Sequence, residues 1–312
     1  MTDSVKATMP ARSAVQTPGR QLVRIGNRYV LPSLAYAVLV ITALSMLIPF
    51  LWMVFTSFKP TQQIFKMPPV IFTDQYTLAH YIRAIMRGNF HIYFKNSMIV
   101  TVSVTLLNVL ITALAGYAFA RLKWRGRELV FLIVLAVMML PGLIALIPTF
   151  LIVKATPFAG GNNWLGQGGT GWLDSYPGLI VPMVGSAFDV FLFRQFFLSL
   201  PVELEDAARI DGCSEFGIFW RIILPLSKAV VAVVALFTFQ YAWNDFLWAL
   251  VITQSDSMRT IQLGLTLFKS QHTVDWGPLM AGTTLATVPT VILFLLFQRY
   301  FVQGIALTGI KG

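Results

Sequence analysis

Long apolar runs alternate along the chain with short segments that carry most of the charge, and this pattern predicts the elements. Six runs each reach the roughly 20 residues that a helix needs to cross the hydrocarbon core of a bilayer. The first lies between Arg28 and Lys59, and the others cover residues 96–120, 129–153, 176–197, 229–251 and 276–298. A segment in lipid must satisfy its own backbone hydrogen bonds, so all of these runs are expected to be helices. The prediction is an all-α integral membrane protein with six transmembrane helices.

Four of the expected spans contain a proline, which removes a backbone donor and clashes with the preceding helical turn. These residues are Pro49, Pro141, Pro182 and Pro289. A kink is therefore expected in the first, third, fourth and sixth spans.

Composition agrees with a membrane protein. Of the 312 residues, 56% are hydrophobic and 12% are charged, whereas soluble domains carry roughly 25% charged residues. Basic residues that flank the spans on the cytoplasmic side explain the net charge of +10 better than nucleic-acid binding does. The single cysteine, Cys213, excludes an internal disulfide, and the three histidines lie too far apart in sequence to indicate a metal site.

The distribution of Lys and Arg predicts the orientation. The tail at residues 1–28 and the short loop at residues 121–127 are both basic, and six spans place them on the same side. That side is expected to be cytoplasmic, with both termini in the cytoplasm and the chain in the cell membrane. The longer loop between the first two spans is also basic, but short loops dominate the rule. The polar tail is expected to be disordered, followed by a transmembrane domain at residues 29–312.

Charged residues inside the expected spans are candidates for function because they are costly in hydrocarbon. Asp189 and Arg194 lie in the fourth span, where an ion pair between them is expected. Asp245 follows Trp243 and Asn244 in the fifth span. An aromatic face beside hydrogen-bonding groups suits a sugar in a translocation path. The same residues could instead form a packing cluster that hydrogen-bonds the fifth span to its neighbours, and both interpretations stay open.

The segment at residues 198–226, between the fourth and fifth spans, predicts a short helix, a glycine turn and a second helix on the cytoplasmic side. Pro201 suits a first helical turn, and the acids that follow it, including Glu205, favour the positive end of the helix dipole. Ala207, Ala208 and Ile210 are expected to form one smooth face that a second protein can approach closely. The end of the first helix and the start of the second are indicated by Gly212 and Ser214.

The spacing of this segment resembles the EAA signature of binding-protein-dependent ABC importer permeases. In that signature an acid and two alanines are followed after three residues by glycine, and after nine more by Ile-x-Leu-Pro. The matching positions here are Asp206, Ala207, Ala208, Gly212, Ile222, Leu224 and Pro225. Asp206 stands where the family usually has glutamate, which keeps the charge on a shorter stem.

Further segments resemble the carbohydrate branch of this family, and in particular the second, six-span permease of maltose-type transporters. They lie at residues 57–60, 96–97, 116–121, 243–246 and 309–312. The resemblance implies a type I importer permease fold, with a core at about residues 92–301. It also implies a second permease subunit, two ATPase subunits that bind ATP and Mg, and an extracytoplasmic sugar-binding protein. The helix of the EAA segment would act as the coupling helix, seated in a groove of the ATPase.

Rival interpretations fit less of the sequence. No GxxxxGK[ST] phosphate loop is present, so the chain is not expected to be an enzyme or to carry a cofactor. A secondary transporter would explain the spans but not the EAA spacing, and the same architecture importing a non-sugar solute is the closer alternative.

The glycine-rich loop at residues 154–175 is either a flexible connection or a contact surface for a partner. A short amphipathic helix is expected at about residues 78–86.

Overall fold

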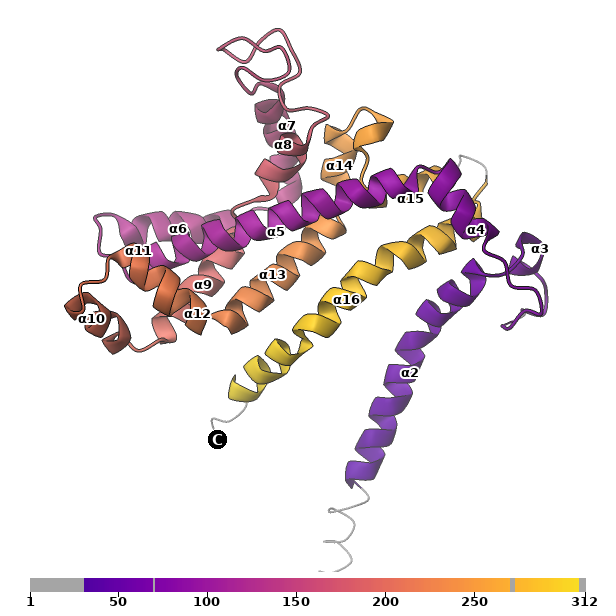
Figure 1. Cartoon of the computed structure of the whole chain (residues 1–312), viewed down its shortest axis with the longest axis horizontal. Helices are drawn as coiled ribbons and strands as arrows, with labels where there is room; N and C mark the ends of the chain where they lie inside the picture. Colours follow the sequence, from indigo (N-terminus) through magenta and orange to yellow (C-terminus); the bar gives the residue numbers. More distant parts are fainter. Residues whose placement is uncertain (1–30, 70, 270–272, 309–312) are drawn as a thin grey trace, which may run out of the picture. The chain divides into compact units, whose positions relative to one another are not determined.

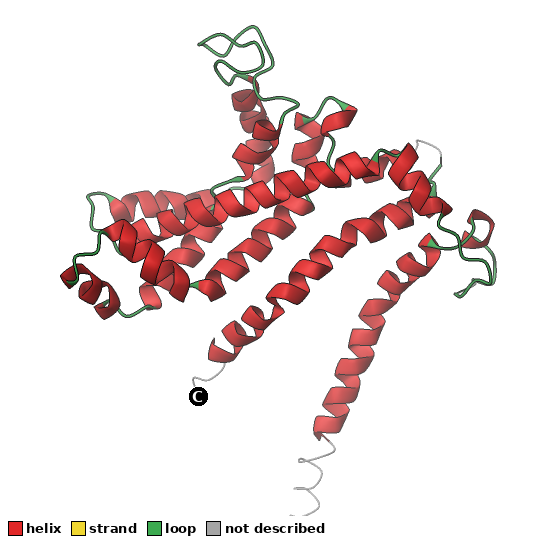
Figure 2. Ribbon diagram, viewed as in Figure 1, coloured by secondary structure: helices red, strands yellow, loops and turns green. Residues whose placement is uncertain are grey.

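The computed structural model describes residues 31–69, 71–269 and 273–308. The polar tail at residues 1–28 and the resemblance at residues 309–312 lie outside these ranges. The regular elements of the described residues are helices, joined by loops and turns, with one isolated β-bridge between Lys269 and Val274 (Figure 2). This agrees with the all-α prediction.

The helices follow the apolar pattern of the sequence. The longer elements are α2 (Leu31–Ser57), α5 (Phe90–Ala120), α6 (Arg127–Met138), α7 (Leu146–Lys154), α9 (Ala187–Ser199), α10 (Glu203–Ile210), α13 (Lys228–Trp243), α14 (Leu247–Ile252) and α16 (Trp276–Thr308). Short helical turns join them: α3 (Thr61–Ile64), α4 (Ala79–Ile82), η2 (Arg83–Arg87), η3 (Gly142–Ala145), α8 (Tyr176–Ile180), η4 (Val181–Met183), α11 (Glu215–Ile218), η5 (Phe219–Ile223), α12 (Leu224–Leu226), η6 (Asp256–Met258), α15 (Ile261–Leu265) and η7 (Thr266–Phe268). The expected helix at about residues 78–86 is present as α4 and η2.

The chain divides into two compact units, residues 1–53 and 54–312. In the first unit the structure describes most of helix α2, whose side chains are almost all exposed. The second unit holds the remaining elements and the packed core.

Three helices are individually long and apolar enough to cross a membrane, and they cover Pro32–Ser57, Phe90–Ala120 and Trp276–Gln298. Three bent helix pairs pass the same test when each pair is taken together, so the structure holds up to six spans in its described part. The pair that covers the third predicted span bends by 99° between α6 and η3, next to Pro141. The fourth bends by 46° between η4, which contains Pro182, and α9. Pro141 lies in the first break and Pro182 shortly before the second, which agrees with the kinks predicted for these two spans. Pro49 and Pro289, in the first and sixth spans, lie inside the unbroken helices α2 and α16.

The fifth span differs from the prediction of one helix over residues 229–251. Helix α13 ends at Trp243, and α14 begins at Leu247 after a break. The side chain of Asn244 donates to the carbonyl of Gln240, and the carboxylate of Asp245 accepts from the backbone amides of Trp248 and Ala249. These side chains satisfy the groups that a continuous helix would have paired internally, which allows the break.

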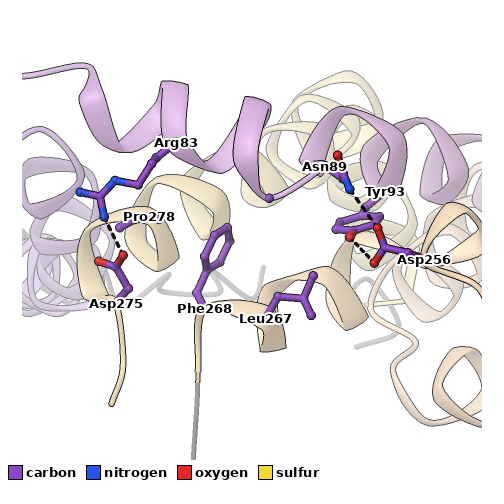
Figure 3. Close-up of a pocket in the computed structure, with 9 residues that line it drawn as sticks. Arg83, Asn89, Tyr93, Asp256, Leu267, Phe268, Asp275 and Pro278 are labelled. Atoms are coloured by element: carbon purple, nitrogen blue, oxygen red, sulfur yellow. Dashed lines mark hydrogen bonds and ion pairs between the residues drawn. The ribbon is translucent and has the colours of Figure 1, made fainter.

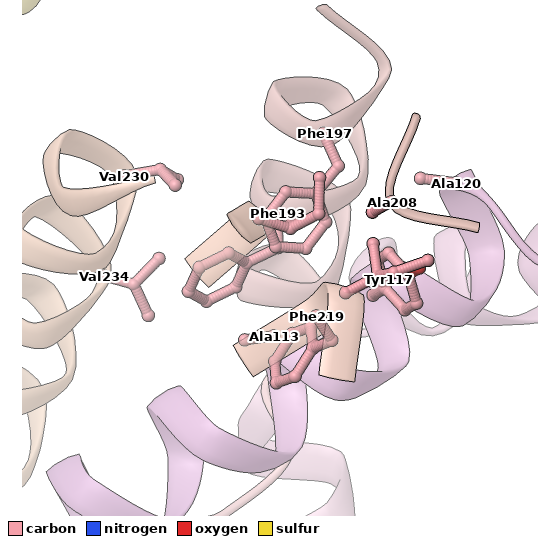
Figure 4. Packing of buried hydrophobic residues seen from close by; sticks show 11 residues of the cluster. Ala113, Tyr117, Ala120, Phe193, Phe197, Ala208, Phe219, Val230 and Val234 are labelled. Atoms are coloured by element: carbon pink, nitrogen blue, oxygen red, sulfur yellow. The ribbon is translucent and has the colours of Figure 1, made fainter. Parts of the chain in front are cut away.

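Helix α5 is the centre of the second unit, because it packs along both α9 and α13 (Figure 1). Gly116 permits the approach of α9, since a Cβ atom at this position would lie 2.5 Å from the Cβ of Phe193. Small residues at helix contacts allow the close packing that holds helices together in lipid, where burial from water contributes little. Figure 4 shows Phe193 and Phe197 of α9 between Val230 and Val234 of α13 and a group that includes Tyr117.

Candidate functional site

The segment with the EAA spacing forms two short helices joined by a tight glycine turn. Helix α10 begins at Glu203, two residues after Pro201, and ends at Ile210. The amide of Gly212 donates to the carbonyl of Arg209, and the amide of Cys213 donates to that of Ala208. Together with a φ of +82° at Gly212, these bonds form a Schellman motif, which requires the left-handed backbone that glycine adopts without strain. The predicted helix end is confirmed.

The second helix starts as the sequence predicts. The hydroxyl of Ser214 accepts from the amide of Gly217, which caps α11. A π-helical turn, η5, continues α11, and α12 carries Pro225 in its first turn. Pro225 and Ser227 then precede α13, and the segment Glu215–Leu226 is bent by 81° from Lys228–Trp243.

The inner face of α10 is held by a buried ion pair. The side chain of Glu205 is 1% exposed, and its Oε1 lies 2.8 Å from Nε of Arg121, which is at the end of α5. The other end of the same guanidinium donates to the carbonyls of Phe197 and Leu200, both at 2.6 Å. Arg121 therefore connects three elements: the end of α5, the end of α9 and the helix α10. Burial raises the pKa of Glu205, while the positive charge of Arg121 lowers it.

A second guanidinium closes the turn between the two short helices. Arg209 lies 2.8 Å from Glu215, 2.9 Å from Asp206 and 3.3 Å from Glu205. The hydrogen bond to Glu215 and the surrounding carboxylates raise the pKa of Arg209. The hydroxyl of Tyr117 on α5 also donates to Glu215, at 2.9 Å. These contacts hold the two short helices in a fixed arrangement. They include Asp206, the acid of the signature, which pairs with Arg209.

The two signature alanines lie on different sides of α10. Ala208 is 6% exposed and packs in the core cluster with Tyr117 and Phe197. Ala207 is exposed, on the same outward side as Leu204 and Ile210, and Ile210 is 87% exposed. The expectation of one smooth face containing both alanines is therefore wrong, because successive helical residues are turned by about 100° from each other. The outward face contains Leu204, Ala207 and Ile210, and is called here the α10 face.

Arg121, Arg209 and Glu215 were not among the site residues predicted from the sequence. Arg209 carried a usable signal, because it stands four residues after Glu205 and three after Asp206 on one helix. Arg121 carried none of this kind, because it reaches Glu205 only through the packing of α5 against α9.

The Trp243–Asp245 group is divided by the fold. Trp243 is 1% exposed, stacks on Phe239 and donates from Nε1 to the carbonyl of Ala286 on α16 at 2.9 Å. For Trp243, the packing interpretation holds. Asn244 and Asp245 instead line an open cavity of about 740 Å³.

The expected ion pair between Asp189 and Arg194 is wrong. Asp189 accepts from Nδ2 of Asn108 on α5 at 2.7 Å and from the hydroxyl of Thr238 on α13 at 3.4 Å. Arg194 lies over the ring of Phe131 on α6, at 4.1 Å from its centroid. The two residues are five positions apart on the helix, which turns their side chains by roughly 140° to different sides of α9.

At the other end of α5, a small pocket of about 310 Å³ collects charged groups from distant segments (Figure 3). Arg83 forms an ion pair with Asp275 at 2.7 Å. Tyr93 and Asn89 both donate to Asp256, at 2.8 and 2.9 Å. These hydrogen bonds lower the pKa of Asp256. The charged groups of this pocket are thus paired, and they join η2 to the residue before α16 and the start of α5 to η6.

The glycine-rich loop is folded and does not resemble a flexible connection. The side-chain amide of Asn162, which is 7% exposed, donates to the carbonyls of Lys154 and Thr156, and its oxygen accepts from the amide of Gly169. Added Cβ atoms at Gly166 and Gly171 would lie 2.0 and 2.3 Å from backbone carbonyl oxygens, so glycine is required there. The loop presents exposed Phe158, Trp164 and Leu165.

Comparison with known proteins places the chain in a family. Residues 108–307 match the family described as binding-protein-dependent transport system inner membrane component. The chain belongs to this family of multi-pass membrane permeases.

Among its curated relatives, the arabinooligosaccharides transport system permease protein AraQ of Halalkalibacterium halodurans is 35% identical over 268 residues, covering 85% of this chain and 91% of the relative. The lactose transport system permease protein LacG of Rhizobium radiobacter is 33% identical, covering 86% and 93%. The trehalose/maltose transport system permease protein MalG of Thermococcus litoralis is 33% identical, covering 88% and 94%.

A solved structure supports the fold. A chain of a bacterial ABC transporter involved in import of the acidic polysaccharide alginate superposes with a TM-score of 0.72 at 21% identity, over 93% of this chain and all of the other. The fold is that of a type I ABC importer permease. Within the described residues, no group of three or more His, Cys, Asp or Glu side chains could hold a metal ion.

Proposed function

We propose that this chain is a membrane-spanning permease subunit of an ATP-driven importer, and that it translocates a sugar or related carbohydrate delivered by an extracytoplasmic binding protein. The relatives named for arabinooligosaccharide, lactose and trehalose/maltose transport support a carbohydrate as the solute. A relative named for sn-glycerol-3-phosphate transport keeps a non-sugar solute as the second candidate.

The α10 face is the observation that carries the coupling role. An ion pair and a buried alanine hold the inner side of α10, whereas the outer side exposes Leu204, Ala207 and Ile210, with the charged Glu203 and Asp206 exposed beside them. A rigid helix with such a face is suited to docking against another protein. In this proposal it docks on one of two ATPase subunits, which bind ATP and Mg, and Arg121 transmits the movement of α10 to α5 and α9.

The remaining parts of the assembly follow from the same proposal. A second permease subunit completes the path, both termini lie in the cytoplasm, and the segment at residues 198–226 faces the ATPases. Asp206 then belongs to the internal network with Arg209, so a change at this position is expected to act on the shape of α10 as well as on docking.

The decisive experiment is purification of the chain with its partners, followed by identification of the solute on the copurified binding protein and uptake into proteoliposomes. Uptake is expected to require internal ATP and no ion gradient. Uptake that proceeds without ATP and collapses with a protonophore would instead identify a secondary transporter. A non-carbohydrate solute on the binding protein would favour the second candidate.

A further inference from the structure

Interruptions of the spans surround one large cavity in the second unit. Its volume is about 980 Å³, and its lining includes Pro141 at the break after α6 and Gly185 at the break before α9. The cavity of about 740 Å³ that contains Asp245 shares four lining residues with it. The shared residues are Gly142, Ala145, Pro182 and Tyr241. The two cavities therefore adjoin each other, and together they are called here the break cavity.

The break cavity is expected to face protein or water and not the lipid chains. Non-helical backbone at membrane depth is tolerated where it is buried in protein or lines a water-filled space. Carboxylates inside spans likewise face the interior of a bundle or a hydrated cavity. Two interrupted spans and two carboxylates, Asp189 and Asp245, meet at the break cavity.

Asp189 is held in place and keeps hydrogen-bonding capacity. The residue is among those that line the cavity, and it is 4% exposed. Asn108 and Thr238 both donate to Oδ2, and no cation of the described residues lies within ion-pair distance. Asn108 is in turn fixed, because its oxygen accepts from the amides of Gly185 and Ser186. A carboxylate can accept about four hydrogen bonds, so the Asp189 side chain has room for donors from a ligand.

Aromatic side chains lie beside this carboxylate. Phe188 is 44% exposed and Tyr241 is 67% exposed, and both line the cavity. In the described part of the chain the hydroxyl of Tyr241 forms no hydrogen bond. Aromatic faces pack on the C–H surfaces of a sugar ring, while acceptors and hydroxyls bind its polar rim.

We propose that the break cavity is a saccharide-contact site of this subunit, in which Phe188 and Tyr241 pack against a sugar ring and Asp189 accepts from its hydroxyl groups. The site rests on the proposed function, because the ligand class is that of the imported solute. The aromatic residues of this site are Phe188 and Tyr241. Trp243, which the sequence suggested, is buried against α16. A helix of the second permease filling the cavity is the competing occupant, and the experiment separates the two.

The test uses the complete transporter with its binding protein, in a Cys213→Ala background that removes the native thiol. Tyr241→Cys and Phe188→Cys are compared with Leu132→Cys, a control on α6 that is 61% exposed and lies outside the cavity lining. A charged, membrane-impermeant methanethiosulfonate reagent reports contact with water. Thiols in the break cavity are expected to react at least about tenfold faster than the control, because reactivity follows access to water.

Lactose, maltose, trehalose and arabinotriose are the sugar probes. Uptake by the unmodified transporter identifies which of them it imports, and failure of all four counts against the proposed function alone. The imported sugar, with its binding protein and a non-hydrolysable ATP analogue, is expected to slow labelling of Tyr241→Cys about threefold or more by covering the site.

The inference would be overturned if both cavity positions, in variants that still assemble, were labelled no faster than the control. That result would favour a cavity filled by a helix of the second permease. Labelling that an imported sugar leaves unchanged would overturn the inference as well. A kinetic check compares the uptake rates of two imported sugars in Tyr241→Phe and Tyr241→Ala. The ratio of the two rates is expected to stay at the wild-type value in Tyr241→Phe, which keeps the aromatic ring, and to change in Tyr241→Ala.

Discussion

At the scale of single residues, Arg121 has the most contacts with separate elements in the candidate site. Its guanidinium reaches the buried carboxylate of Glu205 and two carbonyls at the end of α9. Arginine suits this position because its rigid fork presents several donors in fixed directions and stays charged when buried. A buried pair of this kind contributes little net stability against an apolar replacement, but losing one partner strands the other charge.

We predict that Arg121→Ala destabilises the protein by about 3–5 kcal/mol, since Glu205 would stay buried without its main counter-charge. The measurement is thermal unfolding of the detergent-purified transporter, together with the yield of assembled complex. Arg125→Ala is the matched control, because Arg125 is exposed in the same loop and forms no ion pair in the described structure. Equal stability of the two variants would contradict the assigned role of Arg121.

A substitution at Gly212 tests the effect of backbone strain alone, because an added side chain meets no steric clash there. No atom lies within 4 Å of an added Cβ, so a substitution meets no clash, but φ is +82°. Gly212→Val is expected to cost about 1–2 kcal/mol through the left-handed backbone alone. Gly212→Asn is expected to be milder, since asparagine tolerates this conformation. Thermal unfolding and sugar uptake should rank wild type, Asn and Val in that order, and a reversed rank would contradict the Schellman turn.

At the scale of elements, the two sides of α10 have different surroundings. Its inner side is fixed to the bundle through Glu205 and Ala208, and its outer side presents the α10 face. The adjacent alanines thus have different roles although the signature treats them alike.

This division gives a paired prediction. Ala208→Leu is expected to destabilise the fold by about 1–3 kcal/mol, because the added carbons have no space in the core. Ala207→Leu is expected to leave unfolding unchanged while reducing retention of the ATPase subunits and sugar uptake. Both variants are measured for membrane level, unfolding and copurified ATPase. If Ala207→Leu retains the ATPase and transports normally, the α10 face is not the docking surface.

The glycine-rich loop is a second element whose order depends on one side chain. Asn162→Ala removes three hydrogen bonds to the loop backbone and leaves buried groups unsatisfied, at a cost of about 1–3 kcal/mol. Faster proteolysis and faster amide exchange are expected within residues 155–173. Gln167→Ala is the control, since this exposed side chain forms no hydrogen bond in the described structure. Unchanged protection in Asn162→Ala would show that the loop does not depend on this amide.

At the scale of the whole molecule, the proposed path and docking face belong to a chain whose sequence contains no GxxxxGK[ST] phosphate loop. We predict that the isolated subunit hydrolyses no ATP, whereas the assembled transporter does so at a rate stimulated by the loaded binding protein. The measurement compares turnover of the purified subunit with that of the complex. Hydrolysis by the isolated chain, free of any contaminating ATPase, would refute the proposed division of labour.

The sequence by itself determined the features that depend on short segments. Residues within a few positions of one another account for four of these features. They are the six apolar runs, the bends near Pro141 and Pro182, the Schellman turn at Gly212 and the cap at Ser214. The EAA spacing, read the same way, led to the family that the comparisons confirm. Local patterns suffice here because backbone hydrogen bonds and lipid burial act on each segment separately.

Only the tertiary structure decided which side chains meet. Arg121 reaches Glu205, and Asp189 pairs with Asn108 rather than Arg194, because α5 packs closely against α9. Tyr241 and Trp243 lie two positions apart on α13, which turns them by about 200° from each other. The packing of α13 therefore places Trp243 in the core and leaves Tyr241 in the break cavity. These partners lie far apart in sequence, so hydrophobic periodicity holds no information about them. Close packing between helices selects the contacts, and in the membrane it is this packing that gives each polar side chain its partner.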